Sequence, residues 1–123
     1  VKWVDANQSG AVDTQNTFDY LQLNFSRKVS PDSDAVANPG SAYDYFGWSN
    51  GDNVIDNSLA WDQLQLDSSG VLITIPLATG VKDVFGPGSD TFWVDDGKGI
   101  RDLASGTGNM CIASQAMIIM SAR

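Results

Sequence analysis

The residues best suited to chemistry lie near the amino end, in the run DANQSGAVD at positions 5–13. Oxygen-bearing side chains occupy alternate positions there, and a glycine and a further aspartate follow. Calcium loops have this order, because alternate side chains and one main-chain carbonyl converge on the cation. We therefore predict a Ca²⁺ site whose ligands are the side chains of Asp5, Asn7, Ser9 and Asp13 and the carbonyl of Ala11.

The match to an EF-hand loop is incomplete. The twelfth position, counted from Asp5, is Asn16, whose neutral amide oxygen replaces the bidentate glutamate of that motif. The flanks also have strand character rather than helix character. Three of residues 1–4 are β-branched or aromatic, and apolar residues alternate with polar ones in residues 17–26. The sequence thus predicts a strand on each side of the loop, and a turn without an ion is the alternative interpretation.

Strand-like runs alternate with turn-rich runs along the rest of the chain. The sequence Asp-Ser-Ser-Gly separates residues 61–66 from residues 71–75 and predicts a β-hairpin, while Pro76 ends the second strand or places it at a sheet edge. Further strands are expected at residues 91–94 and 110–121. About seven short strands, without a credible long helix, predict an all-β fold: one Ig-like antiparallel β-sandwich with Greek-key connections over residues 1–123. A closed barrel is the alternative.

The charge composition narrows the range of functions. The net charge is −8, and all 15 acidic residues are aspartates. Such a chain would be repelled by a phosphate backbone, which argues against nucleic acid as a partner. The chain has no histidine, so the commonest general base and the usual zinc ligand are missing. Asp95 and Asp96 are adjacent and would face opposite ways in a strand. We therefore expect no enzymatic activity and no catalytic residues.

One cysteine and the hydropathy pattern bear on location. Cys111 cannot form an internal disulfide, and its apolar setting predicts a buried thiol, with a bond to another subunit as the alternative. No stretch approaches the ~20 apolar residues of a transmembrane helix. The chain starts at Val1 rather than at methionine, which favours a mature or excised piece of a secreted protein.

Three motifs together resemble a known family. They are DANQSGAVDTQNTFDYLQLNFSRKV at residues 5–29, VLITIPLATG at residues 71–80 and GIRDLASGTGN at residues 99–109. They are similar to the opening loop and strand, the threonine-bearing strand and the closing turn of bacterial Ig-like modules repeated in S-layer and other cell-surface proteins. Residues 35–60 follow no pattern of that family, and the closing turn carries extra residues between Ala104 and Asn109.

This resemblance implies an extracellular structural or assembly module at the cell surface, in an S-layer, a filament or a multidomain stalk. Its partners would be copies of itself or adjacent Ig-like domains. Calcium would fix the angle between neighbouring modules by drawing together oxygens at their junction. Asp102 is either a supplementary ligand or a turn cap. The apolar run that ends the chain completes its own sheet or inserts into a neighbour's sheet.

A carbohydrate-binding module or adhesin domain is the alternative function. Tyr43, Tyr45 and Trp48 lie in an aromatic cluster that is rich in polar turn residues. Aromatic faces can stack on sugar rings while neighbouring aspartate and asparagine side chains bond the hydroxyls, so surface glycans are the alternative partner. The competing interpretation is that these rings fill the core.

Overall fold

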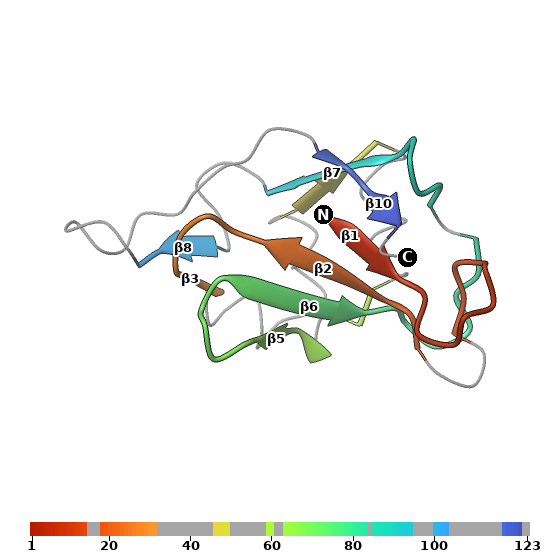
Figure 1. Cartoon of the computed structure of the whole chain (residues 1–123), viewed down its shortest axis with the longest axis horizontal. Helices are drawn as coiled ribbons and strands as arrows, with labels where there is room; N and C mark the ends of the chain where they lie inside the picture. The colour runs from red at the N-terminus through yellow and green to blue at the C-terminus, as the bar shows by residue number, and fades with distance from the viewer. Residues whose placement is uncertain are drawn as a thin grey trace.

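A computed structural model gives the structure of the chain, shown in Figure 1. It describes residues 1–14, 18–31, 46–49, 59–60, 63–83, 85–94, 100–103 and 117–121, with the backbone alone at residues 46–48. The elements of these residues are β-strands, and no α-helix occurs among them. The all-β class predicted from the sequence is therefore confirmed.

The largest unit is a five-stranded sheet. Its order is β10 (Met120–Ser121), β1 (Lys2–Val4), β2 (Tyr20–Asn24), β6 (Leu72–Pro76) and β5 (Gln65–Leu66). In the central antiparallel pair, Leu21 lies opposite Ile75 and Leu23 lies opposite Ile73. All four side chains are buried. The alternation of apolar and polar residues therefore determines which face of β2 packs against the core.

The hairpin expected around residues 67–70 is confirmed. β5 and β6 pair antiparallel, with Gln65 opposite Thr74. Gly70 has a φ of 76°, a value that residues with a Cβ rarely adopt, which explains the glycine at the end of this turn. Pro76 ends β6 as expected, but β6 lies between β2 and β5 and not at a sheet edge.

Two smaller sheets complete the described structure. β4 (Phe46–Trp48), β7 (Thr91–Val94) and β9 (Met117–Ile118) form one of them, in the order β4-β7-β9. β3 (Val29–Pro31) and β8 (Ile100–Asp102) form the other. The sequence analysis predicts no strand at β3 and assigns the residues of β8 to a closing turn. Because these two strands are far apart in the chain, their pairing could not be predicted from local pattern.

The carboxyl-terminal part of the chain departs from the prediction in two ways. The single strand expected up to residue 121 is broken at Ile119 into β9, which pairs with β7, and β10, which pairs with β1. The described residues therefore contain more strands than the seven or so expected. The β1–β10 pair is also parallel, so the expectation of a wholly antiparallel arrangement is wrong at this edge.

All three sheets contribute to one hydrophobic core. Its buried side chains are Trp3, Val12, Leu21, Leu23, Val29, Leu59, Ile73, Ile75, Leu77, Phe85, Phe92, Val94, Ile100 and Ile119. The five-stranded sheet supplies five of the buried strand residues, namely Trp3, Leu21, Leu23, Ile73 and Ile75, and the smaller sheets supply Val29, Phe92, Val94 and Ile100. Burial of apolar side chains between sheets is consistent with a β-sandwich.

Candidate functional site

The loop of residues 5–13 begins directly after β1 and is organised by the carboxylate of Asp5. The backbone N–H of Ser9 donates to Asp5 Oδ1 at 3.0 Å, and that of Gly10 donates to Asp5 Oδ2 at 2.8 Å. Gly10 has a φ of 81°, and Gln8 has a φ of 60°. Calcium loops of the EF-hand type place a glycine at their sixth position for a sharp turn, and Gly10 holds that position here.

The carboxylate of Asp13 is the meeting point of the other predicted ligands. Asn7 Nδ2 donates to Asp13 Oδ1 at 2.6 Å, and Ser9 Oγ lies 3.1 Å from Asp13 Oδ2. Ser9 Oγ is also 3.1 Å from the carbonyl of Ala11. Asp13 itself is only 5% exposed. The structure thus brings Asn7, Ser9, Ala11 and Asp13 into one hydrogen-bonded group, and Asp5 closes the same loop.

A buried aspartate outside the predicted ligand set anchors this loop. Asp19 is fully buried, and its carboxylate accepts hydrogen bonds from Trp3 Nε1 at 3.0 Å and from the backbone N–H groups of Ala6 and Asp13 at 2.9 and 3.2 Å. Buried carboxylates need such donors to offset lost hydration. Asp19 was not singled out from the sequence. Its burial could have been predicted from the sequence. Asp19, Leu21 and Leu23 lie at alternate positions, so their side chains share the apolar face of the predicted strand.

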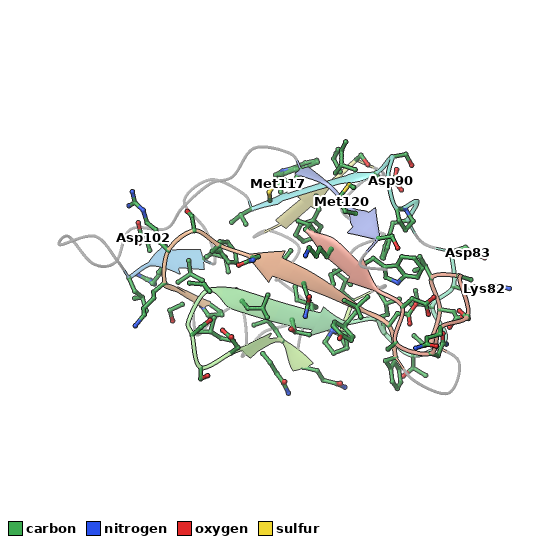
Figure 2. The ribbon with its side chains drawn as sticks, viewed as in Figure 1. Lys82, Asp83, Asp90, Asp102, Met117 and Met120 are labelled. Carbon is green, nitrogen blue, oxygen red and sulfur yellow. The ribbon has the colours of Figure 1, made fainter. Side chains whose placement is uncertain are left out.

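A second segment supports the loop from outside. The backbone N–H of Asp83 donates to the carbonyl of Val12 at 2.7 Å, and Asp13 forms an isolated β-bridge with Lys82. The N–H of Gly80 donates to Thr14 Oγ1 at 3.1 Å. Figure 2 shows Lys82 and Asp83 at the end of the molecule that carries this loop. Residues 80–83 therefore hold the second half of the loop in place.

The direction of β10 relates the loop to the carboxyl-terminal strand. Lys2 pairs with Met120 and Trp3 pairs with Ser121, in parallel. Both strands therefore run toward the same end of the molecule, where β1 leads into the loop (Figure 1). The carboxyl end of β10 therefore points toward the end of the molecule that carries the 5–13 loop.

Asp102 does not belong to this site. Figure 2 shows it at the opposite end of the molecule from Lys82 and Asp83. It lies in β8, and its Oδ2 is 3.1 Å from Arg27 Nη1 in an exposed ion pair. The interpretation of Asp102 as a supplementary calcium ligand is therefore wrong, because the β3–β8 pairing carries it away from the loop.

The metal prediction rests on mixed oxygen donors. In the part of the chain that the structure describes, no group of three or more His, Cys, Asp or Glu side chains is placed to hold a metal ion. The predicted set contains two carboxylates, Asp5 and Asp13, together with one amide, one hydroxyl and one backbone carbonyl. Asn16, at the twelfth position, lies outside the described residues.

Several other sequence candidates also lie outside the described residues. They are Tyr43, Tyr45, Asp95, Asp96 and Cys111, together with the side chain of Trp48, whose backbone forms the end of β4. Trp3, in contrast, is a core residue that donates to Asp19, as expected for a ring that fills the interior.

Searches for related proteins give no family for this chain. No helix among the described residues has the length and apolar character required to cross a membrane. The chain matches no family model, no curated protein and no solved structure.

Proposed function

We propose that this chain is an extracellular structural module of the Ig-like kind, which assembles with copies of itself or with adjacent domains at a cell surface. Calcium bound in the 5–13 loop makes the module rigid at the junction with its neighbour. The observation that carries this proposal is the Asp13 carboxylate, which is almost fully buried and is contacted by the side chains of two other predicted ligands, Asn7 and Ser9.

The chemistry of the loop suits a hard cation. Calcium takes six to eight oxygen ligands, mixing carboxylates with amide and backbone carbonyls and with water. The loop offers two carboxylates, a hydroxyl, a backbone carbonyl and the amide of Asn7. The Asn7 amide directs its nitrogen toward Asp13 in this structure. To bind a cation beside Asp13, the amide would have to rotate so that its oxygen faces Asp13. Asp19 and residues 80–83 restrict the loop and lower the entropy that an ion must remove.

The course of the chain supports a role at a junction. β10 runs toward the end of the molecule that carries the loop, so a domain that follows β10 would start beside the predicted ligands. Calcium would supply positive charge between the Asp5 and Asp13 carboxylates and fix the oxygens in one arrangement. A linker that is fixed in this way transmits the orientation of one module to the next.

The melting temperature with and without calcium tests the proposal. Extracellular calcium modules bind with dissociation constants of roughly 10⁻⁴ to 10⁻³ M, so about 10 mM calcium should nearly saturate the site. Stabilisation follows from mass action and reaches about 2.7 kcal/mol at a free concentration one hundredfold above the dissociation constant. We expect a clear rise in melting temperature over a sample in chelator.

Two matched variants make this experiment specific. Asp5→Asn should abolish the calcium-dependent shift, because it removes a charged ligand. Asp67→Asn should leave the shift intact, because Asp67 is also a turn aspartate that accepts a backbone N–H but belongs to the distant β5–β6 hairpin. An unchanged wild-type melting temperature, with no calcium retained on dialysis by elemental analysis, would remove the calcium site from the proposal.

A further inference from the structure

The carboxyl-terminal segment, residues 117–121, contributes a short strand to each of two sheets: β9 pairs with β7, and β10 pairs with β1. Thr91 and Phe92 of β7 pair with Ile118 and Met117, and the next two pairs join β10 to β1. Between them, the N–H of Ile119 donates to the carbonyl of Asp90 at 2.8 Å, and the N–H of Gly88 donates to the carbonyl of Ile119 at 2.7 Å. Ile119 is the only residue of the segment that the core buries.

The other large side chains of this segment are apolar and exposed. Met117, Ile118 and Met120 are 37%, 48% and 54% exposed, and the two methionines are labelled in Figure 2. The sequence has no charged residue from position 103 to position 122, although 18% of the whole chain is charged. Edge strands are normally protected by charged residues or proline. The β5 and β10 edge strands are both short, but a charged residue, Asp67, directly follows β5, whereas residues 103–122 around β10 contain no charge.

We infer that the carboxyl-terminal segment is exchanged between copies of this chain, so that the segment of one copy occupies the position beside β1 and β7 of another. The partner is a second copy, because the structure shows what fits this position: an Ile119 side chain in the core and backbone bonds to residues 88 and 90. The contacts are the same within one chain and between two. For residues 117–121 the exchange is therefore opposed by the entropy of association alone, and domain swapping is in general a low-cost route to dimers.

The chain provides the reach that this exchange needs. Residues 104–116 join the segment to the end of β8, and a stretch of that length spans up to about 45 Å when extended. The exposed side chains of Met117, Ile118 and Met120 then supply apolar surface where two copies meet. This inference deepens the assembly role proposed above. Its test is run in chelator, so a failure of the calcium site does not affect it.

Disulfide trapping tests the exchange. In a Cys111→Ser background, Lys2→Cys is combined with Met120→Cys, because these positions are register partners of β1 and β10. The matched control combines Lys2→Cys with Gln22→Cys, the register partners of β1 and β2. Equal amounts of isotopically light and heavy chains are unfolded together and refolded at about 1 mM, which is comparable to the effective concentration of a tethered segment, and at about 1 µM, which is far below it. They are then oxidised and analysed by peptide mass spectrometry.

We expect heavy–light disulfides between positions 2 and 120 at the high concentration only, and disulfides between positions 2 and 22 within single chains at both concentrations. Linkage between 2 and 120 that stays within single chains at both concentrations would overturn the inference. Equal heavy–light linkage in both pairs would overturn it as well, because it would reflect nonspecific oxidation.

Native mass spectrometry of the Cys111→Ser chain covers the case in which the paired-cysteine variants do not fold. Light and heavy chains refolded together at high concentration should give mixed dimers that persist after dilution, because separation requires the segment to leave the core. Monomers alone, or mixed dimers that separate at once on dilution, would contradict exchange. Rapid separation would instead indicate contact between intact edges.

Discussion

The 5–13 loop follows β1 in the chain, and the carboxyl-terminal segment, residues 117–121, lies beside β1. The two regions differ in what they expose to solvent. The loop pairs its polar groups internally: Asp5 accepts from two backbone N–H groups, and Asp13 is bonded by Asn7 and Ser9. The segment leaves three large apolar side chains exposed. Under the two proposals above, an ion would reinforce a loop that is already hydrogen-bonded, and a second copy would cover the exposed apolar side chains of the segment.

The anchors of the two regions differ as well. A buried carboxylate, Asp19, holds the loop through three hydrogen bonds to Trp3, Ala6 and Asp13. A buried aliphatic side chain, Ile119, holds the segment together with two backbone bonds. A lost carboxylate leaves several donors buried without an acceptor, whereas a shortened aliphatic side chain leaves a cavity. Substitutions at the two anchors should therefore differ in size and in consequence.

The largest effect is expected for Asp19→Ala. Each buried donor left unsatisfied costs about 1–3 kcal/mol, so the loss of an acceptor for three donors should lower the free energy of unfolding by at least about 3 kcal/mol. Urea unfolding followed by tryptophan fluorescence measures this change, and Trp3 reports directly because its Nε1 donates to Asp19. Asp102→Ala removes the ion pair with the exposed Arg27 side chain, a kind of pair that contributes less than about 1 kcal/mol, and should cost less than Asp19→Ala. Similar losses in the two variants would show that Asp19 is not the anchor of the loop.

The second effect is expected for Ile119→Ala. Truncation of a fully buried isoleucine costs about 2–4 kcal/mol, because apolar burial is lost and a cavity remains. Ile118→Ala is the matched control, since Ile118 is the adjacent residue and is 48% exposed; it should cost less than about 1 kcal/mol. Urea unfolding midpoints of the two variants measure the contrast. The contrast is measured at about 1 µM, where exchange between copies is not expected, and equal costs at both positions there would show that Ile118 is buried within the single chain.

A third substitution separates association from folding. Ile118→Lys places a charge on an exposed edge side chain, so the free energy of unfolding should change by only about 0.5 kcal/mol. Association between copies, measured by sedimentation velocity, should fall, because the exposed Ile118 side chain supplies apolar surface where two copies meet and a lysine there does not. Leu66→Lys on the β5 edge is the control and should leave association unchanged, although Leu66 is 37% exposed, the same fraction as Met117. An equal loss of association in both variants would remove the distinction between the two edges.

Local chemistry explains which features the sequence predicts correctly. The strand after the loop and the β5–β6 hairpin follow from alternation and turn residues within a few positions. The β3–β8 pair and the parallel β1–β10 pair depend on residues far apart in the chain, so local pattern does not specify them. The loop residues could be selected by type and spacing. The anchoring role of Asp19 was not predicted, because an aspartate in a strand is ordinarily assigned to the solvent face.

The smallest predicted effect concerns Asp67, which shows how an aspartate turn behaves away from the candidate site. Ser69 Oγ lies 2.7 Å from Asp67 Oδ1, and Leu72 N–H donates to the same oxygen at 3.3 Å. The Ser69 hydrogen bond, followed by the backbone N–H bonds, lowers the pKa of this carboxyl from its ordinary value. A lowered pKa in the folded state stabilises the fold above the unfolded pKa of about 3.9, and that stabilisation is lost as the pH falls through the folded pKa.

Asp67→Asn should therefore be less stable than the wild type near neutral pH, with a gap in urea midpoint that narrows below about pH 4. A gap of constant size would show that the charge of Asp67 contributes nothing. Calcium should not change this gap, because the hairpin turn satisfies its carboxylate with nearby donors alone. The corresponding gap for Asp5→Asn should grow when calcium is added, since the same kind of turn there also offers Asp13, Asn7 and Ser9 to a cation. Both aspartates accept nearby N–H groups, and the response of the gap to calcium is expected at Asp5 alone.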